Sequence, residues 1–230
     1  MKILGMEKMS LVDFDGLVAA TLFTGGCNFK CGFCHNSLLV NSFMDLPEIS
    51  EEEILSYLKK RFGILDGVCV SGGEPTLNSD LPIFIEKLKA IGYKVKLDTN
   101  GTNPEMVKSL AKDKLVDYFA MDIKNDKDNY AKIIGFDEYN TDKVEKTVEF
   151  FLSGKVDYEF RTTLVKQFHE KQNILNIGQW IKGAKKYFLQ KFKENENCIC
   201  QGFSPVEEVE AKEFIDLLKP QISAVKLRGY

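Results

Sequence analysis

The sequence predicts an α/β fold with parallel strands, a partial (β/α)6 barrel of the TIM type. Short apolar, β-prone runs alternate with amphipathic helical stretches along most of the chain, and this alternation is typical of parallel βαβ units. About six such units can be counted, fewer than the eight that close a TIM barrel. Glycine-rich and polar motifs follow several strand ends, where parallel barrels place their active sites.

The first strand is expected over 18–24 because this run is apolar enough for burial on both faces. Residues 1–16 are expected to be an approach segment, and 35–49 a loop with at most a short helix. A helix begins at Ser50, which forms a capping box with Glu53. Further strands are expected over 67–71, 94–97, 116–123, 156–165, 187–190 and 223–227, and further helices over 80–91, from 103, 141–152, 172–182 and 206–218.

Length and composition predict one soluble domain over residues 1–230. The chain is 44% hydrophobic and 28% charged, which is typical of a globular core with a solvated surface. A formal net charge of -3 gives no reason to expect nucleic-acid binding. Neither an apolar run of membrane length nor a secretory signal is recognisable, so a cytoplasmic location without membrane association is expected.

Three cysteines, Cys27, Cys31 and Cys34, lie within eight residues. Thiolates at this spacing can approach one metal centre. Structural zinc sites and iron-sulfur clusters held only by protein normally use four protein ligands. A group of three therefore predicts a cluster with one iron left open for chemistry.

Two polar motifs follow the second and third predicted strands. Gly72 and Gly73 permit close approach of a ligand, and Glu74 presents a carboxylate beside them. The alternative is an ordinary strand-to-helix turn. Asp98 and Asn100 follow the next strand, where their oxygens could accept hydrogen bonds from ribose hydroxyls. The alternative there is a turn, and both interpretations can hold together.

Charged residues lie on two later strands. Asp122 and Lys124 are two residues apart and so point to the same side of a strand. Charges inside a barrel are costly unless they are paired or bound to a ligand. Arg161 lies in an otherwise apolar strand and needs a carboxylate partner. The alternatives to ligand binding are an Asp122–Lys124 ion pair and a pair of Arg161 with Asp122 or Glu74.

The remaining cysteines and the two histidines are expected to have ordinary roles. Cys69 is expected in the core, and Cys198 and Cys200 as two thiols of a late strand or loop rather than ligands of a second cluster. His35 follows the last loop cysteine and is expected to orient that loop. His169 lies in a polar stretch and is expected at the surface.

The cysteine spacing resembles that of the radical S-adenosylmethionine enzymes, and Gly72-Gly73-Glu74 resembles the second motif of that family. The resemblance implies a 4Fe-4S cluster on Cys27, Cys31 and Cys34, with S-adenosyl-L-methionine bound to the open iron. It implies that Glu74 lies by the methionine amino group, Lys124 by the carboxylate, Asp122 by the ribose or the attacked peptide, and Phe33 by the adenine. With the residue-based assignments, the expected cofactor contacts are Phe33, Gly72, Gly73, Glu74, Asp98, Asn100, Asp122, Lys124 and Arg161, and the expected catalytic residues are the three cysteines and Lys124.

The stretches 9–16 and 23–27, with Cys34-His35-Asn36, look like the activating enzymes of glycyl-radical enzymes, in particular those of anaerobic ribonucleoside-triphosphate reductase. This resemblance implies that the reduced cluster cleaves S-adenosylmethionine and that the resulting 5'-deoxyadenosyl radical takes a hydrogen from a glycine of that partner. Flavodoxin or ferredoxin is the implied electron donor. Residues 187–190 lack the late histidine of the pyruvate formate-lyase activating enzymes.

Three other functions stay open. One is activation of pyruvate formate-lyase. Another is a radical enzyme acting on a small molecule, such as 7-carboxy-7-deazaguanine synthase. The last is a non-enzymatic iron-sulfur electron carrier or a zinc module, either of which needs a fourth protein ligand and leaves residues 72–74 unexplained.

Overall fold

The computed structural model describes residues 1–230. The chain divides into two compact units: unit 1 contains residues 1–28 and 38–119, and unit 2 contains residues 29–37 and 120–230. The chain passes between them in the cysteine loop, after the first residue of the first short helix and within the fifth strand. The single domain expected over 1–230 stays a prediction.

Unit 1 is built on a sheet whose strands follow one another in chain order. These are β1 (Ile3–Ser10), β2 (Ala19–Thr24), β3 (Gly67–Gly72) and β4 (Lys94–Thr99). The pairs β2–β3 and β3–β4 are parallel, and Thr24 lies opposite Gly72, so β2 and β3 end together. Strand β1 pairs antiparallel with β2. The expectation of an approach segment over 1–16 was therefore wrong for β1.

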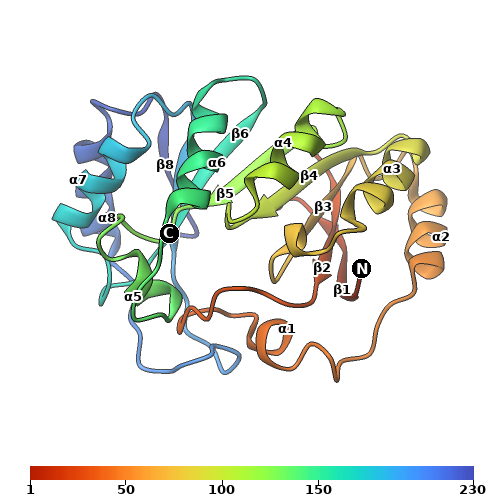
Figure 1. Cartoon of the computed structure of the whole chain (residues 1–230), viewed down its shortest axis with the longest axis horizontal. Helices are drawn as coiled ribbons and strands as arrows, with labels where there is room; N and C mark the ends of the chain where they lie inside the picture. The colour runs from red at the N-terminus through yellow and green to blue at the C-terminus, as the bar shows by residue number, and fades with distance from the viewer. The chain divides into compact units, whose positions relative to one another are not determined.

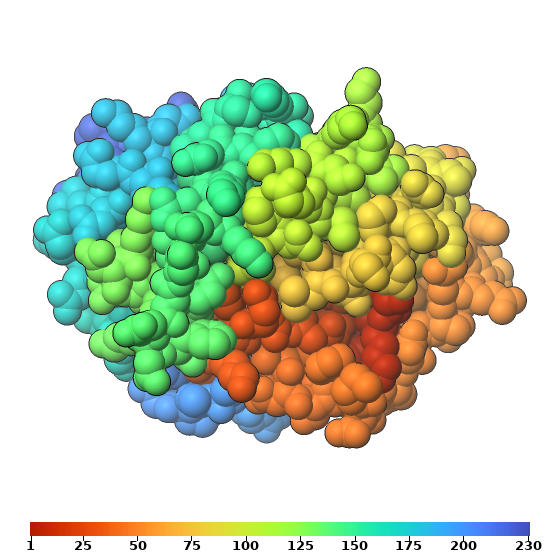
Figure 2. All heavy atoms as spheres, in the orientation of Figure 1, coloured from red at the N-terminus to blue at the C-terminus, as the bar shows by residue number.

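The helices of unit 1 are α1 (Ser37–Asn41), α2 (Glu51–Arg61), the 3₁₀ turn η1 (Pro75–Leu77), α3 (Leu81–Ile91) and α4 (Pro104–Lys112). Helix α2 begins where predicted, because the Ser50 hydroxyl accepts a hydrogen bond from the Glu53 N–H at 3.1 Å. Helices α2 and α3 pack against each other. They are orange and yellow in Figures 1 and 2.

Unit 2 contains a second parallel run of strands. Strand β5 (Tyr118–Asp122) brings the chain into it, and β6 (Tyr158–Leu164), β7 (Tyr187–Lys191) and β8 (Val225–Arg228) pair in parallel. Its helices are α5 (Tyr130–Ile134), α6 (Asp142–Leu152), α7 (Lys171–Trp180) and α8 (Glu208–Leu218). Helices α7 and α8 pack together (Figure 1).

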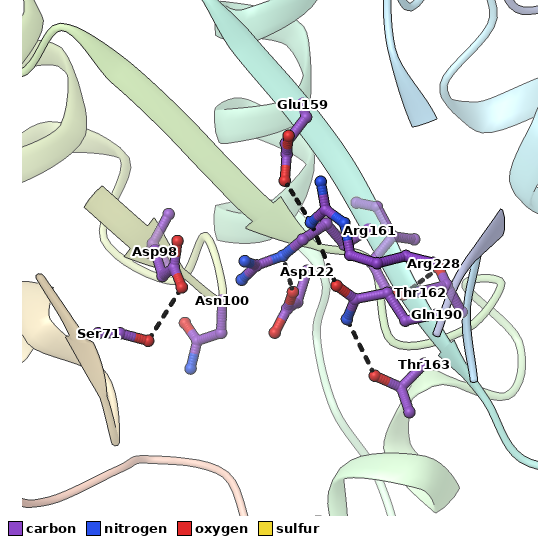
Figure 3. A network of polar contacts seen from close by, with 12 residues as sticks. Ser71, Asp98, Asn100, Asp122, Glu159, Arg161, Thr162, Thr163, Gln190 and Arg228 are labelled. Carbon is purple, nitrogen blue, oxygen red and sulfur yellow. Dashed lines mark hydrogen bonds and ion pairs between the residues drawn. The ribbon is translucent and has the colours of Figure 1, made fainter. Parts of the chain in front are cut away.

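Strand β6 shows how the sheet separates core from site. Tyr158, Phe160, Thr162 and Leu164 are buried on one face. Glu159 and Arg161 alternate with them and so lie on the other face. There Glu159 accepts a hydrogen bond from Arg228 of β8 at 3.0 Å, and Arg161 contacts the end of β5 (Figure 3). One face of the strand thus belongs to the apolar core and the other carries charge.

The expected α/β fold with parallel strands is confirmed. The predicted strands and helices are present with ends shifted by a few residues, and Cys69 is fully buried as expected. Helix α5 was not predicted, since five residues are too few for a periodic signal. All helices are too short or too polar to cross a membrane.

Candidate active site

Glu74 lies directly after β3 and is 1% exposed. Its Oε1 accepts hydrogen bonds from the hydroxyls of Thr76 and Thr99 at 2.5 and 2.7 Å and from the Thr76 N–H at 3.2 Å. Its Oε2 accepts one bond, from the Asn100 N–H at 2.6 Å. Burial raises the pKa of Glu74, and these neutral donors offset only part of that effect. The carboxylate therefore has several hydrogen bonds but no cation beside it in unit 1.

The two glycines before Glu74 are required by backbone packing. Gly72 has a positive φ of 115°, and a Cβ there would lie 2.3 Å from the Thr24 nitrogen. A Cβ on Gly73 would lie 1.9 Å from the Gly26 oxygen. The Gly73 N–H donates to the Thr24 carbonyl, and the Glu74 N–H to the Gly26 carbonyl. The loops after β2 and β3 thus pack backbone to backbone, and these N–H groups are used within unit 1.

Asn100 connects the Glu74 group to the start of the cysteine loop. Its side-chain nitrogen donates to Asn28 Oδ1 at 2.8 Å and lies 4.0 Å from the Cys27 sulfur. Its side-chain oxygen accepts bonds from the N–H and hydroxyl of Thr102. Unit 1 therefore brings three predicted site residues, Glu74, Asn100 and Cys27, into one network.

Asp98 lies beside this network at the end of β4. Its Oδ2 accepts a hydrogen bond from the Ser71 hydroxyl at 2.9 Å (Figure 3). Its Oδ1 lies 3.3 Å from the ammonium of Lys96, which is almost fully buried. Asp98 is therefore held in an ion pair, and its contact with a ribose stays a prediction.

Asp122 of unit 2 is held by two cations. The Lys124 ammonium lies 2.9 Å from its Oδ2. The Arg161 Nε donates to the Asp122 Oδ1 at 2.8 Å (Figure 3). Burial opposes ionisation of Asp122, but Arg161 and Lys124 together hold its pKa below the usual range. The ion pairs considered as alternatives are present. They leave one net positive charge in the group.

The cysteine loop is divided between the units, with Cys27 in unit 1 and Cys31 and Cys34 in unit 2. None of the three forms a disulfide. Burial opposes the charge of Lys124, but Asp122, Cys31 and Cys34 together raise its pKa. Metals bind cysteine in its thiolate form. The donor set, three thiols in one short loop, fits a 4Fe-4S cluster with one open iron.

The segment after β7 pairs with this loop. The Cys200 N–H donates to the Gly32 carbonyl at 2.7 Å, and the Ile199 N–H to the Cys34 carbonyl at 3.1 Å. The Cys198 sulfur faces the Phe33 carbonyl at 3.9 Å. The two late cysteines are thiols of a loop, as expected, but their place beside the cysteine loop was not predicted.

Phe33 is 6% exposed and lies in an aromatic cluster. Its ring packs against Phe168 and Phe192, with centroids 6.4 and 6.2 Å apart. The His35 ring stacks on Phe192 at 5.4 Å. These contacts fix the last turn of the cysteine loop on unit 2, and the contact of Phe33 with adenine stays a prediction.

His169 was expected at the surface, and this was wrong because its ring is fully buried. The Val165 N–H donates to Nδ1 at 3.0 Å, so the ring proton lies on Nε2, which is 2.9 Å from the Lys124 carbonyl oxygen. Burial lowers the pKa of His169 and keeps the ring neutral. His169 thus fixes the main chain of Lys124, although the flanking sequence is polar.

Comparison with known proteins extends this description. The family model of the Radical SAM superfamily matches residues 21–173. A Methanocaldococcus jannaschii protein, provisionally named as a glycyl-radical enzyme activating enzyme, is 32% identical over 97% of this chain and 94% of its own. The pyruvate formate-lyase-activating enzyme of Clostridium pasteurianum is 33% identical over 64% of this chain and 63% of its own.

A solved structure supports the fold. The crystal structure of Streptococcus suis SuiB matches with a TM-score of 0.71 at 15% identity, covering 91% of this chain and 48% of SuiB. The chain thus spans about half the length of that protein. The family match, the near full-length relative and the fold agree. The chain therefore belongs to the Radical SAM superfamily, among the activating enzymes of glycyl-radical enzymes, which use a 4Fe-4S cluster and S-adenosylmethionine.

Proposed function

We propose that Cys27, Cys31 and Cys34 hold the 4Fe-4S cluster and that the chain forms a glycyl radical on anaerobic ribonucleoside-triphosphate reductase. The observation that carries the proposal is the loop of three thiols, two of which lie in the field of the Lys124 ammonium. The near full-length relative supports a glycyl-radical enzyme as the partner class. When bound, the cluster supplies the electron that cleaves S-adenosylmethionine.

The two carboxylate groups suit different parts of this cofactor. The Lys124 ammonium and the Arg161 guanidinium both lie against Asp122, and two cations at one place suit the methionine carboxylate. Glu74 Oε2 accepts one hydrogen bond and keeps acceptor capacity for an ammonium. Asp98, Asn100, Phe33 and the turn at Gly72 and Gly73 complete the proposed binding residues, with Asp98 at the ribose and Phe33 at the adenine.

The reductase is favoured over pyruvate formate-lyase because β7 lacks the late histidine of the pyruvate formate-lyase activating enzymes. Activation of pyruvate formate-lyase is the second candidate, and the Clostridium pasteurianum relative supports it. Flavodoxin or ferredoxin is the proposed electron donor for either partner. A cytoplasmic location fits both.

The test begins without a partner. The cluster is reconstituted anaerobically and reduced with dithionite, S-adenosylmethionine is added, and 5'-deoxyadenosine is measured. Cleavage should occur in the wild type and in Cys200→Ser, a cysteine outside the loop, and should be lost in Cys31→Ala. The reductase and pyruvate formate-lyase are then added separately, and the glycyl-radical signal is recorded by electron paramagnetic resonance. Failure of a fully loaded wild type to cleave the cofactor contradicts the proposal.

A further inference from the structure

Tyr130, the first residue of α5, is a buried tyrosine whose hydroxyl has no hydrogen-bond partner. The side chain is fully buried, and no protein atom pairs with its hydroxyl oxygen at normal geometry. Buried phenol groups almost always have a partner, because an unpaired donor loses its hydrogen bonds to water. The Tyr130 hydroxyl therefore points to a partner outside the polypeptide.

The ring of Tyr130 is fixed by three aromatic neighbours in unit 2. Phe29, at the start of the unit 2 part of the cysteine loop, meets it edge-on with centroids 6.3 Å apart. Tyr139 stacks on it at 6.1 Å, and Trp180 of α7 meets it edge-on at 5.8 Å. A ring held on three sides has little freedom to turn its hydroxyl toward water.

Helix α5 is also joined to the cysteine loop through the backbone. The Lys30 N–H donates to the Ile134 carbonyl at 2.9 Å. Gly135 ends the helix with a φ of 81°, and a Cβ there would lie 2.6 Å from the Lys30 oxygen. Tyr130 and the residue before Cys31 are therefore held in one rigid piece of structure.

Two contacts place the Tyr130 helix against the cysteine loop next to Cys31: Phe29 packs on the Tyr130 ring, and the Lys30 N–H donates to the end of α5. Burial raises the pKa of Tyr130, and the Lys124 ammonium and main-chain N–H lower it. This N–H can only donate, so the hydroxyl proton is still without an acceptor. The phenol therefore keeps its proton at neutral pH and is a hydrogen-bond donor. Cys31, one of the three proposed cluster ligands, directly follows Lys30 and lies two residues after Phe29, so its sulfur is the proposed acceptor.

We propose that the Tyr130 hydroxyl donates a hydrogen bond to the sulfur shell of the cluster at Cys31 and thereby raises the reduction potential of the cluster. Reduction makes the sulfur atoms more negative, so a donor aimed at them stabilises the reduced state more than the oxidised state. Tyr130 is then a positioning and tuning residue rather than a cluster ligand. This inference rests on the proposed function, because it requires a cluster on the cysteine loop.

The test compares Tyr130→Phe with the wild type, and Tyr139→Phe is the matched control. Phenylalanine keeps the ring contacts of residue 130 and removes only the hydroxyl. Tyr139 belongs to the same ring cluster, but its side chain is partly exposed. Each protein is reconstituted to full iron content, and the cluster is titrated electrochemically without S-adenosylmethionine or partner, using electron paramagnetic resonance.

We expect the ratio of reduced to oxidised cluster at a fixed potential to fall about tenfold in Tyr130→Phe, a shift of about 59 mV to more negative potential for one electron. Tyr139→Phe should titrate like the wild type. An exchangeable proton coupled to the cluster should be seen by electron-nuclear double resonance in the wild type and be lost in Tyr130→Phe. An unchanged midpoint potential with a fully loaded cluster overturns the proposal.

A second variant covers the case in which Tyr130→Phe fails to retain the cluster. Replacing Tyr130 with 3-fluorotyrosine gives a more acidic phenol and a stronger donor, so the midpoint potential should become more positive. No shift there overturns the proposal as well. A wild-type cluster that titrates normally but never cleaves S-adenosylmethionine contradicts the proposed function instead, whatever the Tyr130 variants show.

Discussion

The carboxylates at the ends of β3 and β5 are both held by hydrogen bonds, but one has neutral donors and the other has cationic donors. Glu74 in unit 1 is surrounded by hydroxyls and main-chain N–H groups. Asp122 in unit 2 is paired with an ammonium and a guanidinium. Burial consequently raises the pKa of Glu74, whereas the two cations lower that of Asp122.

The kind of donor around a buried acid therefore determines the charge of the ligand that the group can bind. Neutral donors fix the geometry of Glu74 without cancelling its charge, so its surroundings suit an added cation. Two cations more than cancel the charge of Asp122, so that group suits an added anion. A motif of one acid at a strand end is therefore not enough to predict which charge it binds. The hydrogen-bond donors around the acid must also be known.

The largest expected effect comes from Asp122→Asn, which leaves two partly buried cations without their anion. Removing one partner of a buried pair costs about 3–5 kcal/mol, and the partial exposure of this group places the loss near 3 kcal/mol. The free energy of unfolding of the protein without its cluster, from urea denaturation, measures it. Asp128→Asn, an exposed acid on the following loop, is the control. Equal stability of the two variants would show that the ion pairs contribute nothing.

Glu74→Gln should cost about 2 kcal/mol, the loss typical of a buried donor left without an acceptor. An amide nitrogen placed at Oε2 faces the Asn100 N–H, and one placed at Oε1 faces the Thr76 N–H. In either orientation one main-chain donor loses its acceptor. The same urea experiment measures the change, with Glu86→Gln on the exposed side of α3 as control. A loss no greater than that control means that the hydrogen bonds to Glu74 are not specific to a carboxylate.

The sequence was sufficient to predict the strand-end motifs but not their donors. Cysteine spacing and Gly72-Gly73-Glu74 are local patterns. The Thr76 hydroxyl reaches Glu74 within one turn, but the Thr99 hydroxyl meets Glu74 only because β3 and β4 end side by side. No sequence pattern indicates that a single threonine will contact a distant acid, so the neutral surroundings of Glu74 could not be predicted.

Three other features, His169, Tyr130 and strand β1, were missed for a different reason. His169 lies in a polar stretch, and its inward orientation depends on the Val165 and Lys124 backbones folding around it. Tyr130 lies on a helix of five residues, too short for a periodic pattern. Strand β1 has a mixed pattern of buried and exposed residues and is ordered by pairing with β2. In each case the information is in tertiary contacts rather than in local spacing.

The pH dependence of stability should have opposite signs at the two acids. A raised folded-state pKa at Glu74 gives stability that is present below its unfolded value, near 4.5, and is lost as the pH rises through the folded value. A lowered pKa at Asp122 gives stability that is present above its unfolded value, near 3.8, and is lost as the pH falls. A tenfold difference in proton affinity between the folded and unfolded states corresponds to about 1.4 kcal/mol of stability.

Unfolding free energies from about pH 2 to 8 test this comparison when each variant is subtracted from the wild type. The advantage of the wild type over Glu74→Gln should shrink as the pH rises above about 4.5, and its advantage over Asp122→Asn should shrink as the pH falls below about 3.8. Subtraction removes the titration of all other groups. Parallel profiles for the two variants would contradict the assignment of opposite pKa changes.

Salt concentration should change the stability costs of these substitutions least. It should lower the cost at Asp122, whose donors are cations, and leave the cost at Glu74, whose donors are neutral, unchanged. The side chains of Lys124, Asp122 and Arg161 are partly reached by solvent, and at 1 M ionic strength the screening length is only about 3 Å. The cost of Asp122→Asn should therefore fall by about 0.5 kcal/mol between 0.05 and 1 M sodium chloride. The cost of Glu74→Gln should not change, since its donors are neutral and solvent does not reach it. Equal salt sensitivity would mean that a cation near Glu74, rather than hydrogen-bond geometry, stabilises the acid in unit 1.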